Sequence, residues 1–112
     1  MASDRTGQDR TGQTAVIFVS ERTGEDEAGY AAAAARMDAL AAAQPGYRGI
    51  EAVRGPDGTG ITVSYWADDA AARAWRDEAD HAATREAGRE RWYSGYVLTV
   101  ATVTRGYRWS RP

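Results

Sequence analysis

The feature that most constrains the fold is a turn between two alternating runs of residues. The turn, Gly55-Pro56-Asp57-Gly58, consists of residue types that favour a tight reversal of the chain. Residues 47–54 and 60–66, on either side of it, alternate apolar and polar side chains, as half-buried strands do. A short turn returns the second strand antiparallel to the first. The sequence therefore predicts an antiparallel β-hairpin in the middle of the chain.

A strand and a helix are expected before this hairpin, and a helix and a strand after it. The expected elements are strands at residues 14–20 and 97–104 and helices at residues 26–43 and 68–91. Asp68 or Asp69 is the expected cap of the second helix. The apolar stripe of the first helix consists of Tyr30, Ala33, Met37 and Leu40. The order β-α-β-β-α-β predicts an α+β, ferredoxin-like fold, with a four-stranded antiparallel sheet and both helices on one face.

The sheet is expected to be apolar on both faces. Side chains of one parity are Ile17, Val19, Ile61, Val63 and Tyr65, and those of the other are Val16, Phe18 and Trp66. Two helices cover only one face, and no further layer is visible in the sequence. A second copy of the chain is the simplest cover for the open face, so we expect a homodimer that packs sheet to sheet.

The first 13 residues differ in character from the rest. They contain a tandem repeat, Asp-Arg-Thr-Gly-Gln at residues 4–8 and again at 9–13, and almost no apolar side chain. Such a segment cannot bury enough apolar area to offset the entropy lost on ordering. We expect residues 1–13 to be a flexible tail and residues 14–112 to form one domain.

Composition excludes several classes of protein. A net charge of −2 is unsuited to nucleic acid, and no apolar run is long enough to span a membrane. There is no cysteine and a single histidine, so neither a disulfide nor a metal site is expected. The sequence contains no glycine-rich phosphate loop, so neither a flavin nor a nicotinamide cofactor is expected. With no signal peptide visible, we expect a cytoplasmic protein.

Several motifs together are typical of one known family. They are Pro45-Gly46-Tyr47-Arg48-Gly49-Ile50, Ser64-Tyr65-Trp66, Ala74-Trp75, Asp80-His81, Gly88-Arg89-Glu90-Arg91-Trp92-Tyr93, Tyr96 and Val100-Ala101-Thr102-Val103. This set resembles the antibiotic biosynthesis monooxygenase family of dimeric α+β barrels, over residues 14–107. Members include cofactor-free oxygenases, haem-degrading enzymes and proteins of unknown role, so the resemblance implies the fold and leaves more than one activity open.

The resemblance implies a pocket between the helices and the sheet. In a cofactor-free oxygenase of this kind, an electron-rich aromatic such as a polyketide phenol, a hydroquinone or an anthrone loses a proton and passes an electron to O2. The pocket then needs apolar and aromatic walls and a base or hydrogen-bond partner. The expected catalytic residues are Trp75, His81 and Tyr65, and the expected substrate-binding residues are Trp66, Arg85, Trp92 and Tyr96.

Most of these residues have a structural interpretation as well. Trp75 shares one line of its helix with three alanines, which fits a core residue as well as a pocket wall. Tyr65 and Trp66 point to opposite faces of the sheet, so one faces the helices and the other the dimer seam. Trp92 and Tyr96 also fit packing at the hinge between the second helix and the last strand.

His81 and Arg85 keep alternative roles. His81 fits a base, a haem ligand or a solvated helix residue, and Arg85 fits either a partner for an anionic substrate oxygen or an ion-pair partner. The haem-degrading subgroup pairs an Asn on the first strand with a His about three turns beyond a Trp. Here the first strand has no Asn, and the position three turns beyond Trp75 is Arg85.

The leading hypothesis is therefore a cofactor-independent monooxygenase that acts on an aromatic substrate with O2. A haem-binding or haem-degrading protein, with His81 as the axial ligand, is the second. A non-catalytic dimeric protein that binds a small molecule is the third.

Overall fold

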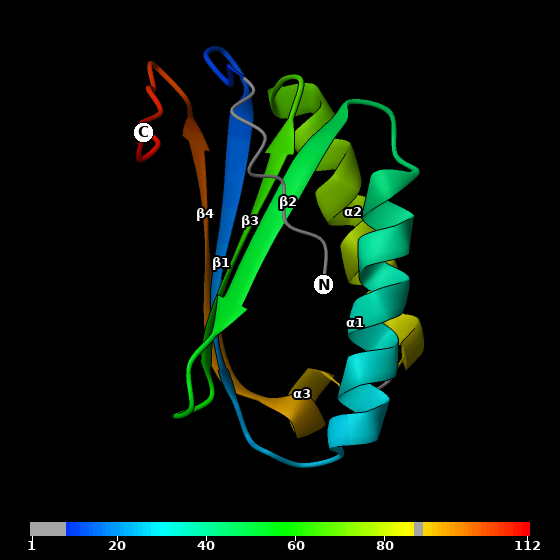
Figure 1. The fold of residues 1–112 in the computed structure, drawn as a ribbon. Coiled ribbons are helices and arrows are strands. Elements are labelled where there is room, and N and C mark those ends of the chain that lie inside the picture. Colours follow the sequence, from blue (N-terminus) through cyan, green and yellow to red (C-terminus); the bar gives the residue numbers. More distant parts are fainter. Residues whose placement is uncertain (1–8, 87–88) are drawn as a thin grey trace.

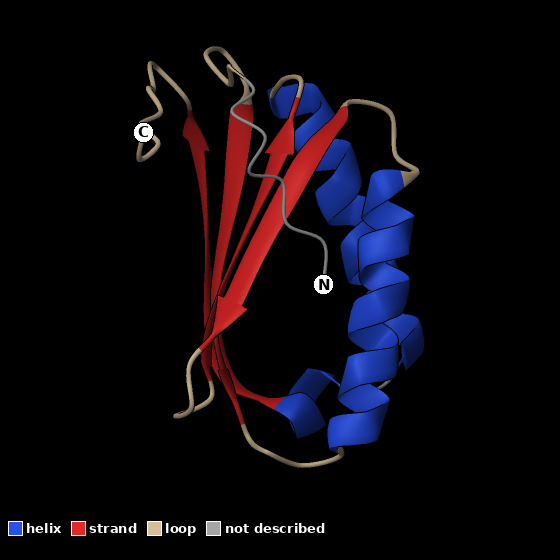
Figure 2. Cartoon of the chain, viewed as in Figure 1, coloured by secondary structure: helices blue, strands red, loops and turns tan. Residues whose placement is uncertain are grey.

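The computed structural model describes residues 9–86 and 89–112, without the side chains of residues 81–86 and 89. Its elements are β1 (Thr14–Arg22), α1 (Glu27–Ala42), β2 (Tyr47–Arg54), β3 (Thr59–Trp66), α2 (Asp69–Glu86), α3 (Arg89–Trp92) and β4 (Tyr93–Thr102). The strands form one sheet in the order β2-β3-β1-β4, and all neighbours are antiparallel. Both long helices cover the same face of this sheet (Figures 1 and 2). The predicted ferredoxin-like α+β fold is confirmed.

The start of each long helix is set by a capping aspartate. Asp26 accepts a hydrogen bond from the Gly29 amide at 3.2 Å, and Asp68 accepts one from the Ala71 amide at 2.8 Å. A capping carboxylate satisfies a helix N–H group that has no partner within the helix and complements the helix dipole. The expected cap at Asp68 is thus confirmed. No helix in the described parts of the chain is both long and apolar enough to cross a membrane.

The expected start of the last strand at residue 97 is wrong, because β4 already begins at Tyr93. The helix expected over residues 68–91 is described in two parts, α2 to Glu86 and α3 at Arg89–Trp92, and residues 87–88 lie outside the described part of the chain. The strand starts early because residues 93–96 pair with the end of β1, where Tyr93 lies opposite Arg22 across a bulge. This pairing is a tertiary interaction, and it extends the strand beyond the start expected from the sequence.

Residues 9–13, which the sequence assigns to the tail, contact the sheet. The Gly12 amide donates to the Val103 carbonyl at 2.9 Å, and the Val103 amide donates to the Gln13 carbonyl at 2.9 Å. The guanidinium carbon of Arg10 lies 3.8 Å from the centre of the Tyr65 ring. Residues 1–8 lie outside the described part of the chain, so a flexible tail stays a prediction.

Candidate functional site

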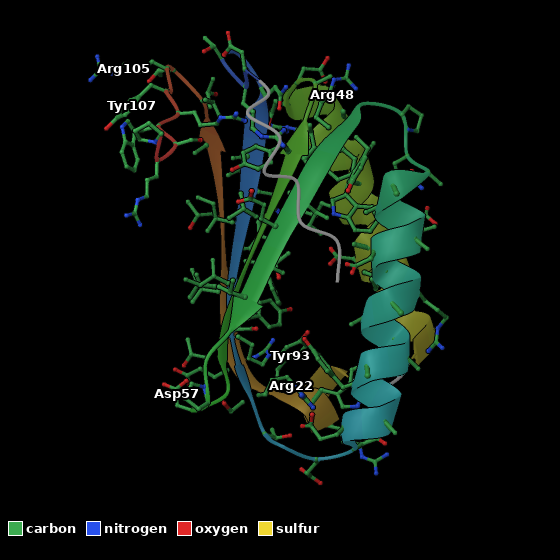
Figure 3. The ribbon with its side chains drawn as sticks, viewed as in Figure 1. Arg22, Arg48, Asp57, Tyr93, Arg105 and Tyr107 are labelled. Carbon is green, nitrogen blue, oxygen red and sulfur yellow. The ribbon has the colours of Figure 1, made fainter. Side chains whose placement is uncertain are left out.

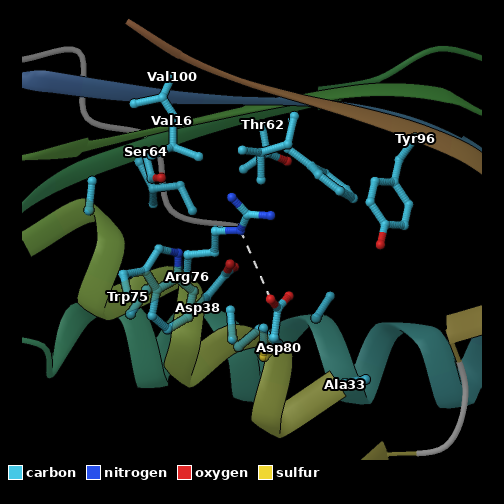
Figure 4. A pocket seen from close by; sticks show the side chains of 18 of the residues that line it. Val16, Ala33, Asp38, Thr62, Ser64, Trp75, Arg76, Asp80, Tyr96 and Val100 are labelled. Atoms are coloured by element: carbon cyan, nitrogen blue, oxygen red, sulfur yellow. Dashed lines mark ion pairs between the residues drawn. The ribbon is translucent and has the colours of Figure 1, made fainter. Parts of the chain in front are cut away.

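A cavity of about 520 Å³ lies between the sheet and the two long helices (Figure 4). Five alanines contribute to its helix side: Ala33, Ala34, Ala41, Ala72 and Ala79. Alanine side chains are too short to fill the space between a helix layer and a sheet, so this composition leaves room where bulkier residues would pack. Natural ligand sites have volumes of about 300–1,000 Å³. The cavity is therefore large enough for a small organic molecule.

Two stacked tryptophans pack at one end of the layer. Trp66 is fully buried and stacks on Trp75 with 5.6 Å between ring centroids. The Trp66 Nε1–H donates to Ser64 Oγ at 3.0 Å, and Tyr47 packs edge-on against Trp66 at 5.8 Å. Trp75 is half-buried and also lines the cavity. It is thus both a core residue and a pocket wall, the two interpretations left open by the sequence.

Five aromatic rings gather at the other end of the cavity, near α3. They are Phe18, Tyr30, Trp92, Tyr93 and Tyr96, and all five line the cavity. Tyr30 packs edge-on against Trp92 at 6.0 Å and against Tyr93 at 5.8 Å. Tyr96 contacts Phe18 at 5.1 Å and Tyr93 at 5.9 Å. We call this group the aromatic cluster; its mutual contacts fix the positions of the rings.

Two arginines support the aromatic cluster (Arg22 and Tyr93 are labelled in Figure 3). The guanidinium carbon of Arg22 lies 3.6 Å from the centre of the Tyr30 ring, and Arg54 Nη2 donates to the Tyr30 hydroxyl at 2.9 Å. The Arg22 side chain is only 4% exposed, and it pairs with Glu27 Oε1 at 3.0 Å. It also donates to the Trp92 carbonyl at 3.2 Å. These contacts satisfy a buried charge and hold Tyr30 in one orientation.

Two groups in and beside the aromatic cluster have shifted pKa values. Burial, with a smaller contribution from Tyr30, raises the pKa of Tyr93 far above its usual range, so this phenol stays protonated near neutral pH. Trp92 Nε1–H donates to Asp26 Oδ2 at 3.2 Å, and this bond is the main cause that lowers the pKa of the Asp26 carboxyl. Because Asp26 also caps α1, the bond anchors α3 to the first turn of that helix.

Charged side chains from the helices form a polar wall opposite the sheet. Figure 4 shows Asp38 of α1 beside Arg76 and Asp80 of α2. Arg76 Nε lies 4.0 Å from Asp80 Oδ2, and burial raises the pKa of the Asp38 carboxyl. None of the three is among the site residues predicted from the sequence. A signal for Asp38 was present, because it lies four residues after Ala34 and three before Ala41, on the buried face of α1.

The predicted site residues are distributed over both faces of the sheet. Trp75, Trp92 and Tyr96 line the cavity. Trp66 faces the helices but lies in the core beside Trp75. Tyr65 lies on the opposite face of the sheet and does not line the cavity. Any catalytic role for these residues stays a prediction.

His81 and Arg85 belong to α2, but their side chains lie outside the described residues. Their predicted roles, including His81 as a base or as a haem ligand, stay predictions. Among the residues that the structure describes, no group of three or more histidine, cysteine, aspartate or glutamate side chains is arranged to hold a metal ion.

Two sequence comparisons relate the chain to known proteins. A family model described as antibiotic biosynthesis monooxygenase matches residues 13–87. The uncharacterised protein YqjZ of Bacillus subtilis (strain 168) is 51% identical over 72 residues, which are 64% of this chain. The aligned part of the chain spans 63% of the length of that relative.

Solved structures share the fold. A variant of SnoaB, a cofactor-independent oxygenase from Streptomyces nogalater, matches with a TM-score of 0.71 at 18% identity, over 86% of this chain and 97% of its own. PA3566 from Pseudomonas aeruginosa matches with a TM-score of 0.66 at 14% identity, over 90% of this chain and 98% of its own. At these identities the likeness establishes the fold alone. Because the family model covers about two thirds of the sequence, however, the chain belongs to the antibiotic biosynthesis monooxygenase family.

Proposed function

We propose that this protein is a cofactor-independent monooxygenase that oxidises an electron-rich aromatic compound with O2. The observation that carries the proposal is the cavity of about 520 Å³, with five aromatic rings at one end and charged side chains along one wall. Membership of the family supports the reaction class, as does the fold shared with SnoaB, which is described as a cofactor-independent oxygenase. Suitable substrates are polyketide phenols, hydroquinones and anthrones.

The substrate itself reduces O2 in this reaction. Removal of a proton leaves the electron pair of the broken bond on the ring system. One electron passes to O2, and the resulting radical and superoxide combine to form a carbon–oxygen bond. For an anthrone, loss of water from the hydroperoxide leaves a carbonyl group, so anthrone and O2 give quinone and water. The protein has to bind the rings, exclude water and accept the proton.

The length of the cavity favours a substrate with several fused rings. Tyr30, in the aromatic cluster, and Asp38, in the polar wall, are both on α1 and eight residues apart. At the helical rise this separation is about 12 Å along the axis. A single six-membered ring is too short to contact both ends of such a cavity, whereas a linear three-ring system reaches from one toward the other.

We also infer that two copies of the chain pair through the open face of the sheet. Val53, Ile61, Val19 and Val97 are direct cross-strand neighbours on that face and form a row across all four strands. Their side chains are 36–65% exposed. A second copy, packed by a two-fold axis, would remove this apolar row from water.

Substitution of Val97 tests the dimer. We expect Val97→Glu to elute as a monomer in size-exclusion chromatography at micromolar concentration, because it would bury a charge between two sheets. Thr104→Glu, an exposed position beyond the end of β4, is the matched control and should leave the dimer intact. A wild-type protein that is monomeric at the same concentration would contradict the inference.

Oxygen uptake tests the activity. The purified protein is mixed with dithranol (a dihydroxyanthrone) or a hydroquinone, in the presence of EDTA and without flavin. We expect saturable O2 consumption above the uncatalysed rate, with one quinone formed for each O2 from the anthrone. Tyr96→Ala, which removes a ring of the aromatic cluster, should reduce the rate of O2 consumption. Tyr107→Ala, at a position that is 97% exposed, is the control and should leave the rate unchanged.

Other outcomes of this experiment separate the alternatives. No uptake with any such substrate would remove the proposal, and saturable binding without uptake would favour a non-catalytic binding protein. A saturable Soret shift on addition of haemin that His81→Ala abolishes would instead favour the haem-binding alternative.

A further inference from the structure

The polar wall contains a carboxyl group whose surroundings differ from those of the other acids in the cavity. Asp38 projects from α1, and its neighbours along the same helix face are Ala34, Met37 and Ala41, all of which line the cavity. No described side chain forms an ion pair or hydrogen bond with it. An acid among alanine and methionine side chains is poorly solvated when it is charged.

The remaining titratable and charged groups of the cavity come from two other elements and from α1 itself. They are Asp69, Arg73, Arg76 and Asp80 of α2, Tyr93 and Tyr96 of β4, and Tyr30 of α1. The two arginines of α2 have acids of their own helix as partners: Arg73 Nε lies 2.7 Å from Asp69 Oδ2, and Arg76 Nε lies 4.0 Å from Asp80 Oδ2. Those acids therefore pair with a cation one turn away on their own helix, whereas no arginine among the described residues forms an ion pair with Asp38.

We propose that Asp38 is the base of this pocket and that its carboxylate accepts the proton which the aromatic substrate loses before it reacts with O2. The inference rests on the proposed function and adds the residue that starts the reaction. Burial favours the protonated form of Asp38 and so strengthens it as a proton acceptor when it is ionised. Asp69 and Asp80 are weaker candidates because each already pairs with an arginine of its own helix.

The step balances in protons and electrons. The Asp38 carboxylate takes the proton of an acidic C–H bond of the substrate, and the electron pair of that bond stays on the rings as an enolate. After O2 adds at the same carbon, Asp38 returns the proton to the terminal peroxide oxygen. It then removes the second hydrogen of that carbon as hydroxide leaves, the carbonyl forms, and the hydroxide takes this proton to become water. Asp38 ends as the carboxylate.

The geometry also orients the substrate. With Asp38 about 12 Å along α1 from Tyr30, fused rings that lie between the aromatic cluster and the polar wall pass beside Asp38. Figure 4 shows the Arg76 side chain extending from α2 toward the sheet beside Asp38. Its positive charge lies beside the cavity, where it favours the negative charge that develops on the rings when the proton is removed.

The test compares Asp38→Asn with wild type, with dithranol as the probe and with two separate readouts. The first is O2 uptake as a function of pH. The second is the absorbance of the enolate of bound dithranol without O2, which reports deprotonation alone. We expect Asp38→Asn to bind dithranol as wild type does, to form no enolate and to lose about 10²-fold or more in rate. The rise of the wild-type rate with pH, at a value above the ordinary pKa of aspartate, should disappear in the variant.

Two further variants keep the result unambiguous. Asp38→Glu retains a carboxyl group and should recover part of the rate and of the enolate signal. Asp77→Asn makes the same chemical change at an exposed position of α2 outside the cavity and should behave as wild type. Circular dichroism of each variant confirms that it is folded.

The outcomes separate this inference from the proposed function. If Asp38→Asn keeps the wild-type rate, pH profile and enolate signal, Asp38 is not the base, although the monooxygenase remains. If wild type forms the bound enolate but consumes no O2, and Asp38→Asn forms none, the base is supported and the oxygenase fails. If wild type forms no enolate, the proposal for Asp38 is overturned.

Discussion

Aromatic rings gather at both ends of the layer between the helices and the sheet, but different interactions hold them. At one end Trp66 and Trp75 stack among alanines, and Trp66 is fully buried. At the other end Tyr30 lies against the Arg22 guanidinium and accepts a hydrogen bond from Arg54. The first end depends on buried apolar area, whereas the second depends on charges and hydrogen bonds. We therefore expect substitutions of the stacked tryptophans to lower the free energy of unfolding more than substitutions in the aromatic cluster.

The largest expected effect is that of removing the buried ring at the first end. Trp66→Ala should lower the free energy of unfolding by about 3–5 kcal/mol, because it deletes the largest fully buried side chain and leaves a void beneath α2. Urea denaturation followed by circular dichroism measures the change. The comparison is Tyr96→Ala in the aromatic cluster. Because Tyr96 is 43% exposed, this substitution should lower the free energy of unfolding clearly less. Equal losses would show that both ends contribute alike to the core.

A smaller effect is expected from the buried phenol at the second end. Tyr93→Phe should lower the free energy of unfolding by about 1 kcal/mol at neutral pH, because it removes the hydrogen bond between the Tyr93 and Tyr30 side chains. The more specific signature is at high pH. Because the pKa of Tyr93 is raised in the folded protein, its contribution is complete below the unfolded-state pKa of tyrosine, about 10, and is lost as the pH rises above it.

Unfolding measured from pH 8 to 11 checks this prediction. Wild type should lose stability across that range more steeply than Tyr93→Phe, and ultraviolet absorbance should show one tyrosine that resists ionisation until the protein unfolds. Tyr107→Phe, at an exposed ring, should leave the slope as in wild type. Parallel slopes for wild type and Tyr93→Phe would mean that the second end does not shield this phenol.

The fold could be predicted from the sequence because its signals are local. The turn at residues 55–58 and the alternation on either side of it determine the hairpin, and β2 has the expected bounds, Tyr47–Arg54. Where a boundary depends on a distant partner, the prediction fails. Trp92 ends α3 and donates to Asp26, which lies 66 residues earlier, and no local pattern near residue 92 contains that bond.

The candidate site was less predictable for a related reason. Aromatic residues stand out in a sequence, so Trp75, Trp92 and Tyr96 were identifiable as lining the cavity. Asp38 has the spacing of the buried face of α1, but that spacing does not show that a cavity lies beside it, because the cavity forms only where α1 packs over the sheet. Strand alternation separates Tyr65 from Trp66 but cannot assign either to a face, because both faces of this sheet are apolar.

The smallest expected effect concerns the bond that ties the second end to α1. Because the pKa of Asp26 is lowered in the folded protein, mainly by the Trp92 indole, its carboxylate stabilises the fold above the unfolded-state value of about 3.9. That contribution is lost as the pH falls through the lower folded-state value. Asp26→Asn keeps a side chain that caps helices and tolerates the left-handed backbone at this position, where φ is 53°. It should therefore change stability little at pH 7.

Unfolding measured from pH 6 to 3 should show a shallower decline for Asp26→Asn than for wild type. Asp77→Asn removes one exposed carboxyl elsewhere and serves as the control for net charge. Trp92→Phe keeps the ring but removes the donor, so it should flatten the decline to the same extent, and the double variant should flatten it no further. Additive effects of the two substitutions would mean that Asp26 and Trp92 act separately. In that case ring contacts and Arg22 would hold the second end, much as stacking holds the first. The two ends would then differ less in the interactions that stabilise them than the geometry indicates.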